Sequence, residues 1–307
     1  MIDEALARTS DTLLMWAVVA YVLAMLGYFA ELAFGTRTPR PIAGGAVDTM
    51  PPSVSAALAD APSQASGVGI LAVALTLVGW GLHVGAAVTR GLAVDRVPWG
   101  NMYEFSSMVS LAAVTAWLGV LRRHRIRHLG GFVMLPVVIY LAVAAMVLYA
   151  PAAPLVPALN SYWIKIHVVG AIMSFGIFMV GFVTAVLYLW RVRADRRGVA
   201  SRLPAAATLD RVSYRVHAFG FPVWTFAVMA GAVWAEAAWG RYWGWDPKET
   251  WSFITWVFYA GYLHARSTAG WRGSRAAWVA VVGFGSLMVT YYVVNLVVSG
   301  LHSYSGV

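Results

Sequence analysis

Eight apolar stretches, each close to the length that crosses a bilayer, dominate this 307-residue sequence and leave it few folds to adopt. A helix needs about 20 mostly apolar residues to span the hydrocarbon core, and only helices or closed barrels satisfy the backbone hydrogen bonds there. We therefore predict an all-α, polytopic integral membrane bundle of about eight transmembrane helices. The stretches cover residues 13–34, 68–89, 104–121, 130–150, 168–190, 217–238, 251–266 and 277–299.

Composition agrees with a membrane protein. Hydrophobic residues make up 60% of the chain and charged residues 11%, and the mean hydropathy is +0.70, whereas a soluble domain usually carries about 25% charged residues. The sequence has no cysteine, which excludes disulfides, thiol exchange and thiolate metal ligation by this chain. Any redox step on a substrate thiol is therefore expected from separate thiol-reducing proteins.

The basic residues predict how the bundle is oriented. Of the 22 lysines and arginines, 16 fall in one set of alternate loops and 6 in the other. Cytoplasmic loops carry the excess of basic residues, so we expect both termini on the non-cytoplasmic side, with a bacterial cytoplasmic membrane as host. The net charge of +9 is then a topology signal, and we expect no nucleic-acid partner.

The chain is expected to have three parts. Residues 1–34 contain the first transmembrane helix, which is too long for a cleavable signal peptide. Residues 35–67 are rich in Pro, Ala, Gly and Ser and predict a flexible cytoplasmic linker. Residues 68–307 form the main membrane domain. No useful internal repeat is evident in the sequence.

A loop between the sixth and seventh apolar stretches concentrates tryptophan. It reads Trp239-Gly240-Arg241-Tyr242-Trp243-Gly244-Trp245-Asp246. Tryptophan is common in belts at the membrane interface, but indole faces separated by glycines also suit a large, flat, apolar ligand. Both interpretations stay open on these residues alone. The continuation places Asp246, Pro247 and Glu249 at the N-cap, N1 and N3 positions of a predicted helix.

The histidines differ in their expected depth. His167 and His302 fall near the outer ends of the fifth and eighth helices, on the side of the tryptophan loop. Imidazole is a common axial ligand of haem iron, so this pair suits a six-coordinate haem, although each alone suits a hydrogen-bonded interfacial residue. His83 and His264 lie within helices, where ionisable groups usually have a partner or a ligand. His217 is expected at the inner interface.

Three cations add positive charge on the outer side, near the tryptophan loop and the outer histidines. They are Arg241, Lys248 and Lys165, and the two lysines are the only ones in the chain. These side chains are candidates for contact with haem propionates. They are equally candidates for interfacial anchors that extend their charged ends to water.

Together these motifs resemble the tryptophan-rich WWD signature of haem-handling proteins. The loop at 239–249, with outer-histidine segments at 161–167 and 300–304, is similar to the CcsA/ResC type of system II cytochrome c biogenesis. Residues 262–266 resemble the intramembrane histidine segment of that family, and residues 98–105 resemble a further segment after the second helix. Chain length and the Pro-x-Glu continuation of the loop favour system II over the CcmF and CcmC types.

The resemblance implies a role in cytochrome c assembly. Proteins of this type pair with a CcsB/ResB-type membrane subunit, and the complex moves haem b across the membrane. The haem is presented at the outer face to an apocytochrome c with a Cys-x-x-Cys-His site, and its vinyl groups become thioethers. An enzymatic role is expected only as part of such a cytochrome c synthase complex, with haem as its substrate or transient ligand.

The resemblance also assigns residues. It implies that His167 and His302 ligate the iron of the outer haem. His264 would ligate haem within the membrane, its partner ligand coming from the CcsB/ResB subunit. No residue receives a catalytic role beyond positioning haem. The other residues expected at haem, from the resemblance or from their position, are His83, Trp239, Gly240, Arg241, Trp243, Trp245, Asp246 and Lys248.

Three other functions remain open at this point. A haem exporter that performs no attachment would share the same helices and histidines. A b-type electron-transfer protein would need two histidines facing each other at matching depth, which His83 and His264 do not provide. A transporter for another substrate would not require the outer tryptophan loop.

Overall fold

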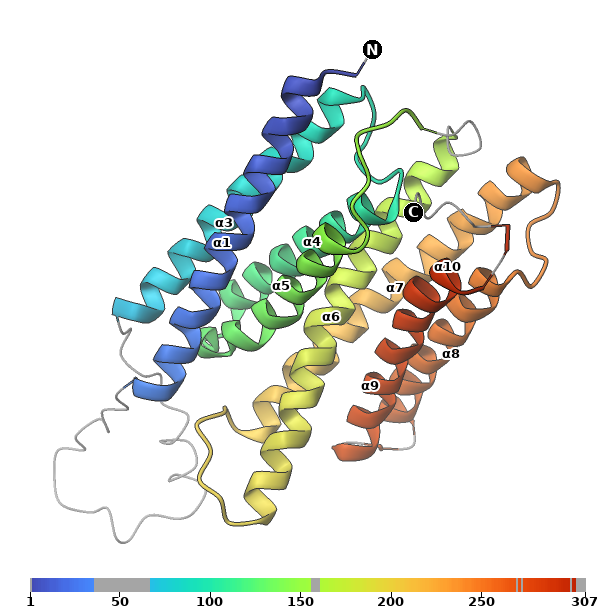
Figure 1. Ribbon diagram of the computed structural model, residues 1–307. Helices are drawn as coiled ribbons and strands as arrows, with labels where there is room; N and C mark the ends of the chain where they lie inside the picture. Colours follow the sequence, from blue (N-terminus) through green and yellow to red (C-terminus); the bar gives the residue numbers. More distant parts are fainter. Residues whose placement is uncertain are drawn as a thin grey trace, which may run out of the picture.

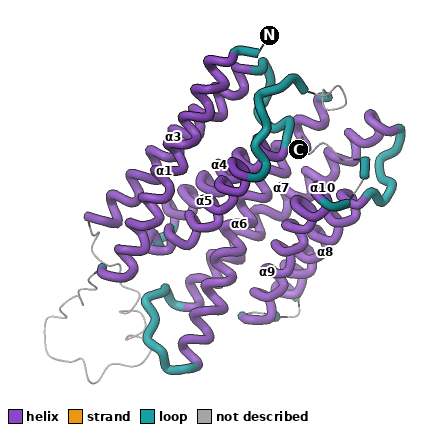
Figure 2. Tube along the Cα trace, in the orientation of Figure 1, coloured by secondary structure: helices purple, strands orange, loops and turns teal. Residues whose placement is uncertain are grey.

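All eight apolar stretches form helices. The computed structural model describes residues 2–35, 67–155, 161–268, 270–271, 273–298 and 300–301, and in this part of the chain the helices are joined by loops and short turns, as Figure 2 shows. The predicted linker, apart from Gly35 and Gly67, lies outside the described residues. The helices are α1 (Glu4–Phe34), α3 (Gly67–Ala93), α4 (Met102–Arg123), α5 (Gly130–Met146), α6 (Tyr162–Arg196), α7 (Ala206–Trp239), α8 (Pro247–Ser267) and α9 (Ser274–Met288).

The last helix is interrupted near the end of the bundle that carries the tryptophan loop, which we call the outer end after the orientation that the basic residues predict. After α9 the chain continues through a π-helical turn, η3 (Val289–Val293), into the short α10 (Val294–Leu296). A 3-10 turn, η1 (Arg127–Leu129), precedes α5. Single π-helical turns inside α-helices often mark functional positions, and this one lies where several helix ends converge.

The helices confirm a polytopic membrane protein. Among the described residues, seven helical segments are long and apolar enough to cross a bilayer, and α8 is the eighth helix of the bundle. With 35 and 34 residues, α6 and α7 are about 50 Å long, which exceeds a hydrocarbon core of about 30 Å. Their inner ends therefore project beyond it.

Glycine and alanine let the long helices approach closely. Helix α1 packs along α3, and α6 along α7 (Figure 1). A Cβ atom added at Gly170 of α6 would lie 2.9 Å from Cβ of Ala227 on α7, and one added at Gly176 would lie 2.5 Å from the backbone nitrogen of Ala113 on α4. Small residues at such contacts are the usual means of helix association in membranes.

Several buried charged residues form ion pairs between helices. At the inner end, Glu31 of α1 accepts from Arg127 at 2.6 Å, and Arg266 of α8 donates to Asp210 of α7 at 2.6 Å. At the other end the N–H of Asp3 donates to the carbonyl of Ala93 at 3.0 Å, which ties the start of α1 to the end of α3. The start and the described end of the chain thus lie at the same end of the bundle, as an even number of crossing helices requires.

His217, expected at the inner interface, is buried among the helices. Helix α7 begins at residue 206, well before the apolar stretch, so His217 lies inside the bundle and is fully buried. Its Nδ1–H donates to the carbonyl of Ser213 at 2.8 Å, and its ring packs against those of Phe178 and Tyr259. Gly181 provides the room, because a Cβ there would lie 2.6 Å from His217 Cε1.

The α4–α6 contact predicts the effect of adding one methyl group. Gly176→Ala would push α6 away from the α4 backbone, at a cost of about 1–3 kcal/mol for overpacking. Gly119→Ala on α4 is the matched control, since nothing lies within 4 Å of its added Cβ. Size-exclusion chromatography after heating in detergent should show a lower melting temperature for Gly176→Ala only. Equal melting temperatures would contradict the close packing.

Candidate functional site at the outer end of the bundle

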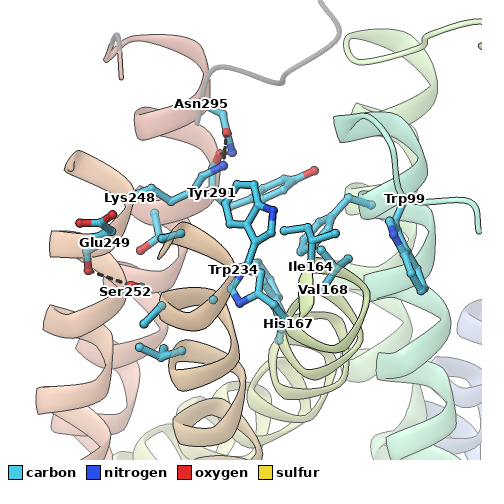
Figure 3. Close-up of a pocket in the computed structure, with 18 of the residues that line it drawn as sticks. Trp99, Ile164, His167, Val168, Trp234, Lys248, Glu249, Ser252, Tyr291 and Asn295 are labelled. Atoms are coloured by element: carbon cyan, nitrogen blue, oxygen red, sulfur yellow. Dashed lines mark hydrogen bonds between the residues drawn. The ribbon is translucent and has the colours of Figure 1, made fainter. Parts of the chain in front are cut away.

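A pocket opens where the outer ends of five helices converge. Its walls come from the starts of α4, α6 and α8, the end of α7, the tryptophan loop, and the η3–α10 segment. It encloses about 1180 Å³ of space between its walls, part of which is open to solvent. Figure 3 shows His167 and Trp234 near its centre, with Lys248 and Glu249 on one side and Trp99 on the opposite side.

His167 presents a ring nitrogen that the protein leaves available. Its Nδ1 lies 2.7 Å from the carbonyl oxygen of Ala227. A carbonyl oxygen only accepts, so Nδ1 carries the hydrogen, and Nε2 keeps its lone pair. Nε2 has no hydrogen bond within the described residues, and the side chain lines the pocket. Gly231 is required beside it, because a Cβ there would lie 2.6 Å from Nδ1. Metal-ligating histidines are commonly oriented by a hydrogen bond of this kind.

The tryptophan loop offers its indoles unequally. Trp239 ends α7 and packs edge-on against Trp234, with ring centroids 4.8 Å apart. Gly240 follows in the left-handed conformation, at φ 69°, which suits a helix C-terminus. Trp243 lines the pocket, whereas Trp245 is 65% exposed and packs edge-on against Trp243 at 5.8 Å. Trp243 is therefore the loop indole that faces the cavity.

The loop is wrapped around the carboxylate of Glu249. Glu249 accepts from the backbone N–H groups of Gly244 and Asp246, at 2.8 and 3.1 Å, and from Arg241 Nη1 at 3.0 Å. The predicted capping box of α8 is thus confirmed. Glycine is needed at 244, because a Cβ there would overlap the Arg241 guanidinium. Arg241, expected at haem, instead forms an ion pair within the loop.

Asp246 connects the loop to the C-terminal segment. Its Oδ1 accepts from the N–H of Lys248 at 3.1 Å, and its Oδ2 accepts from the N–H of Leu301 at 2.9 Å. Asp246 is buried, so these bonds hold the described end of the chain against the tryptophan loop. His302 follows Leu301 in the sequence and lies outside the described residues.

Lys248 carries a positive charge into the pocket. Its Nζ donates to Oδ1 of Asn295 on α10 at 2.6 Å, and it forms no ion pair with any described carboxylate. Burial lowers the pKa of Lys248 to about 8, and the nearby carboxylate of Asp246 opposes this shift. At neutral pH the side chain is therefore a partly buried ammonium group whose charge remains available to an anionic ligand.

The other two predicted histidines lie away from this pocket. His83 is fully buried in α3, with Nδ1 3.3 Å from Tyr21 Oη and Nε2 2.9 Å from Ser107 Oγ. His264 is exposed in the last turn of α8. It lies 16 residues after Lys248, or about 24 Å along the helix axis. The structure thus brings together His167, Trp243 and Lys248 but not His83 or His264.

Sequence reasoning did not assign four residues that line the pocket, namely Trp99, Trp234, Tyr291 and Asn295. Asn295 could have been found, because it is the one amide side chain in the last apolar stretch, and polar groups inside membranes usually have a partner. Tyr291 had no such signal, because the π-helical turn sets its position. Its hydroxyl donates to the carbonyl of Met102 at 2.8 Å and bonds Ser106 at 2.7 Å.

Comparisons with known proteins identify the family of this chain. The family model described as Cytochrome C assembly protein matches residues 99–302. Proteins named Cytochrome c biogenesis protein CcsA from Gloeobacter violaceus and Guillardia theta are 35% and 37% identical to this chain. Those alignments cover 78% and 70% of this chain and 86% and 79% of the relatives.

A solved structure shares the fold. The chain named Cytochrome c Heme Lyase CcmF superposes with a TM-score of 0.68 at 16% identity. The match covers 94% of this chain and 46% of that longer one, so the similarity concerns the fold alone. The matched family model and the CcsA relatives go further: this chain belongs to the CcsA family of cytochrome c assembly proteins, and its role lies in cytochrome c biogenesis.

Proposed function

We propose that the protein binds haem in the outer pocket and promotes its covalent attachment to apocytochrome c, together with a CcsB/ResB-type membrane subunit. The observation that carries the proposal is the available Nε2 of His167 in a pocket lined by aromatic side chains. Neutral imidazole is a ligand for haem iron, and indole faces suit the porphyrin plane. Family membership supports haem as the ligand.

Other residues near the pocket suit the haem propionates and the second axial position of the iron. The partly buried ammonium group of Lys248 suits a propionate, because the amide of Asn295 is its only hydrogen-bond partner among the described residues. His302 is proposed as the second axial ligand. The backbone bond between Leu301 and Asp246 supports this role, since it holds the residue before His302 at the tryptophan loop.

Attachment requires positioning more than acid–base catalysis. Each cysteine thiol of the Cys-x-x-Cys-His site adds across one haem vinyl group: a sulfur–carbon bond forms at one vinyl carbon, and the thiol hydrogen ends on the other. No external electrons are consumed in this addition, although the thiols must first be kept reduced by separate proteins. The proposed task of His167 and Trp243 is to hold the porphyrin so that its vinyl edge faces the incoming thiols.

A second haem position is proposed at the inner end of α8. His264 is exposed there and its ring has no hydrogen bond within the described residues, so an imidazole from the CcsB/ResB subunit is free to complete the ligation. His83 is a weaker candidate for iron ligation, because each ring nitrogen already has a partner inside the bundle. The excess of basic residues on the inner loops supports haem moving from this side to the outer pocket of a cytoplasmic membrane.

Replacing His167 tests the proposal directly. We expect the haem of the purified protein to be lost, or its reduced spectrum to change, in His167→Gly, and added imidazole to restore the spectrum by taking the vacated ligand position. His124→Ala, in the inner loop after α4, is the matched control and should keep the wild-type spectrum. Absorption spectra and a pyridine haemochrome assay provide the measurement. Haem retained unchanged in His167→Gly would contradict iron ligation by this residue.

Attachment is tested in the complete complex. Coexpression with a CcsB/ResB subunit and an apocytochrome c should yield covalent haem, detected by haem staining of denaturing gels, and His167→Gly should abolish the product. A wild-type complex that binds haem in the outer pocket but forms no covalent product would support an exporter without attachment activity.

The charge of Lys248 predicts a pH dependence of haem binding. Because burial lowers the pKa of Lys248 to about 8, its ammonium form prevails at pH 7 and is lost as the pH rises toward 9. Haem affinity should therefore fall above pH 8, by at most roughly tenfold per pH unit. In Lys248→Met the affinity should be lower at pH 7 and nearly flat to pH 9. A wild-type slope that persists in Lys248→Met would assign the titration to another group.

A further inference from the structure

Two loops at the outer end follow one plan. The tryptophan loop runs from Arg241 to Glu249, and a second loop runs from Arg96 to Glu104 between α3 and α4. In both, an arginine precedes the glutamate by eight residues, and a helix N-cap residue, Asn101 or Asp246, precedes it by three. The shared pattern is Arg-x-x-x-x-(Asn/Asp)-x-x-Glu. Nine residues, of which only the arginine and the glutamate are identical, are too few for an internal repeat to be evident in the sequence.

The hydrogen bonds of the two loops match as well. Glu104 Oε2 accepts from the N–H of Gly100 at 2.8 Å, and Glu249 Oε2 accepts from the N–H of Gly244 at 2.8 Å. Arg96 donates to Glu104 at 2.7 Å, as Arg241 donates to Glu249 at 3.0 Å.

Each of the two glycines lies against the guanidinium of its loop arginine, so that an added Cβ would collide with it. Both loops are therefore folded around a buried carboxylate.

The helices that carry these loops also pack alike. In the first half, α1 packs along α3 and also against α5, while α4 packs against α5. In the second half, α6 packs along α7 and also against α9, while α8 packs against α9. In each half the loop joins the second helix to the third. The described chain thus contains two four-helix units of the same plan, and binding sites in membrane proteins with internal repeats commonly lie between the repeats.

The two units differ in what lies beneath the loop. Arg90 stands 14 residues before Glu104, and its guanidinium fills the first unit, bonding Glu104 at 3.0 Å and the carbonyl of Ala150 at 2.6 Å. The residue 14 positions before Glu249 is Ala235, whose small side chain lines the pocket. The space beneath the loop is therefore part of the pocket in the second unit, whereas the Arg90 guanidinium occupies it in the first.

The first loop nevertheless faces the same pocket. Trp99, Gly100, Asn101 and Met102 line it from the side opposite Lys248 and Glu249, as Figure 3 shows for Trp99. Trp99 is the one tryptophan of this loop, and it is only partly buried, so its indole is accessible to a ligand. Two ion pairs, to Arg90 and Arg96, and the N–H of Gly100 fix the Glu104 carboxylate beneath it.

We propose that the Arg96–Glu104 loop is the second wall of the ligand site, where Trp99 contacts the bound ligand across the pocket from the tryptophan loop. Glu104 is then a positioning residue: it holds the loop that carries Trp99, just as Glu249 holds the loop that carries Trp243. This proposal rests on the proposed function, since it takes haem as the ligand.

The test compares haem release from full-length variants purified with their haem. Transfer to excess apomyoglobin gives the dissociation rate, and the reduced spectrum reports the haem environment. Loss of one aromatic contact should make Trp99→Ala release haem roughly three- to tenfold faster, with Trp99→Phe close to wild type. Trp16→Ala, on the exposed face of α1, is the matched control and should have no effect.

Glu104→Gln should also speed release and shift the spectrum, because the loop loses its charged anchor. Glu31→Gln is its control: this buried carboxylate is ion-paired with Arg127 at the other end of the bundle. Equal acceleration in both variants would mean a general loss of stability and would overturn the positioning role of Glu104. If Glu104→Gln does not fold, the Trp99 variants alone decide whether this loop contacts the ligand.

The outcomes separate the two proposals. Wild-type protein that retains haem while Trp99→Ala and Glu104→Gln release it at the wild-type rate would overturn the second wall alone. Wild-type protein that retains no haem, even with its partner subunit, would overturn the proposed function and this inference with it.

Discussion

Hydrocarbon offers no hydrogen-bond partners, so every backbone N–H and carbonyl within the bilayer must be satisfied inside its own segment. The chain meets this constraint with eight helices, and its irregular backbone gathers at their ends. The backbone N–H groups of the outer loops then need hydrogen-bond acceptors within the protein. Glu104 and Glu249 supply them, each binding backbone N–H groups and an arginine of its own loop. The pocket exists because these two carboxylates hold the loops in place.

The charge of Lys248 supports the proposed anionic ligand. Burying an unpaired charge is costly, and most buried charges here have a counter-ion. Lys248 differs, because its described partner is the neutral amide of Asn295. A partly buried ammonium group that is hydrogen-bonded to a neutral amide attracts an anionic ligand, which would suit haem propionates in the proposed site. Aromatic walls and one available imidazole nitrogen complete a site for a flat, amphipathic metal complex.

The two halves illustrate how one plan supports different roles. In the first, Arg90 fills the space under the loop and locks α3 to α4 and to the segment after α5. In the second, Ala235 leaves that space open, and α6 contributes His167 beside it. The first half thereby provides a rigid wall, and the second half provides the ligand-binding groups. Close contacts between the halves, such as Gly176 of α6 against Ala113 of α4, hold them together.

Sequence alone determined the membrane class, the eight helices and the capping box of α8, because apolar length and N-cap chemistry are local properties. Local motifs also identified His167 and the tryptophan loop. Tertiary structure decided which loop residues face the pocket, since Trp243 and Trp245 are equivalent in sequence and differ in exposure. It also decided that His217 is buried, that Arg241 is paired, and that Trp99, Tyr291 and Asn295 join the site. Those outcomes depend on contacts between segments far apart in the chain, which no local pattern encodes.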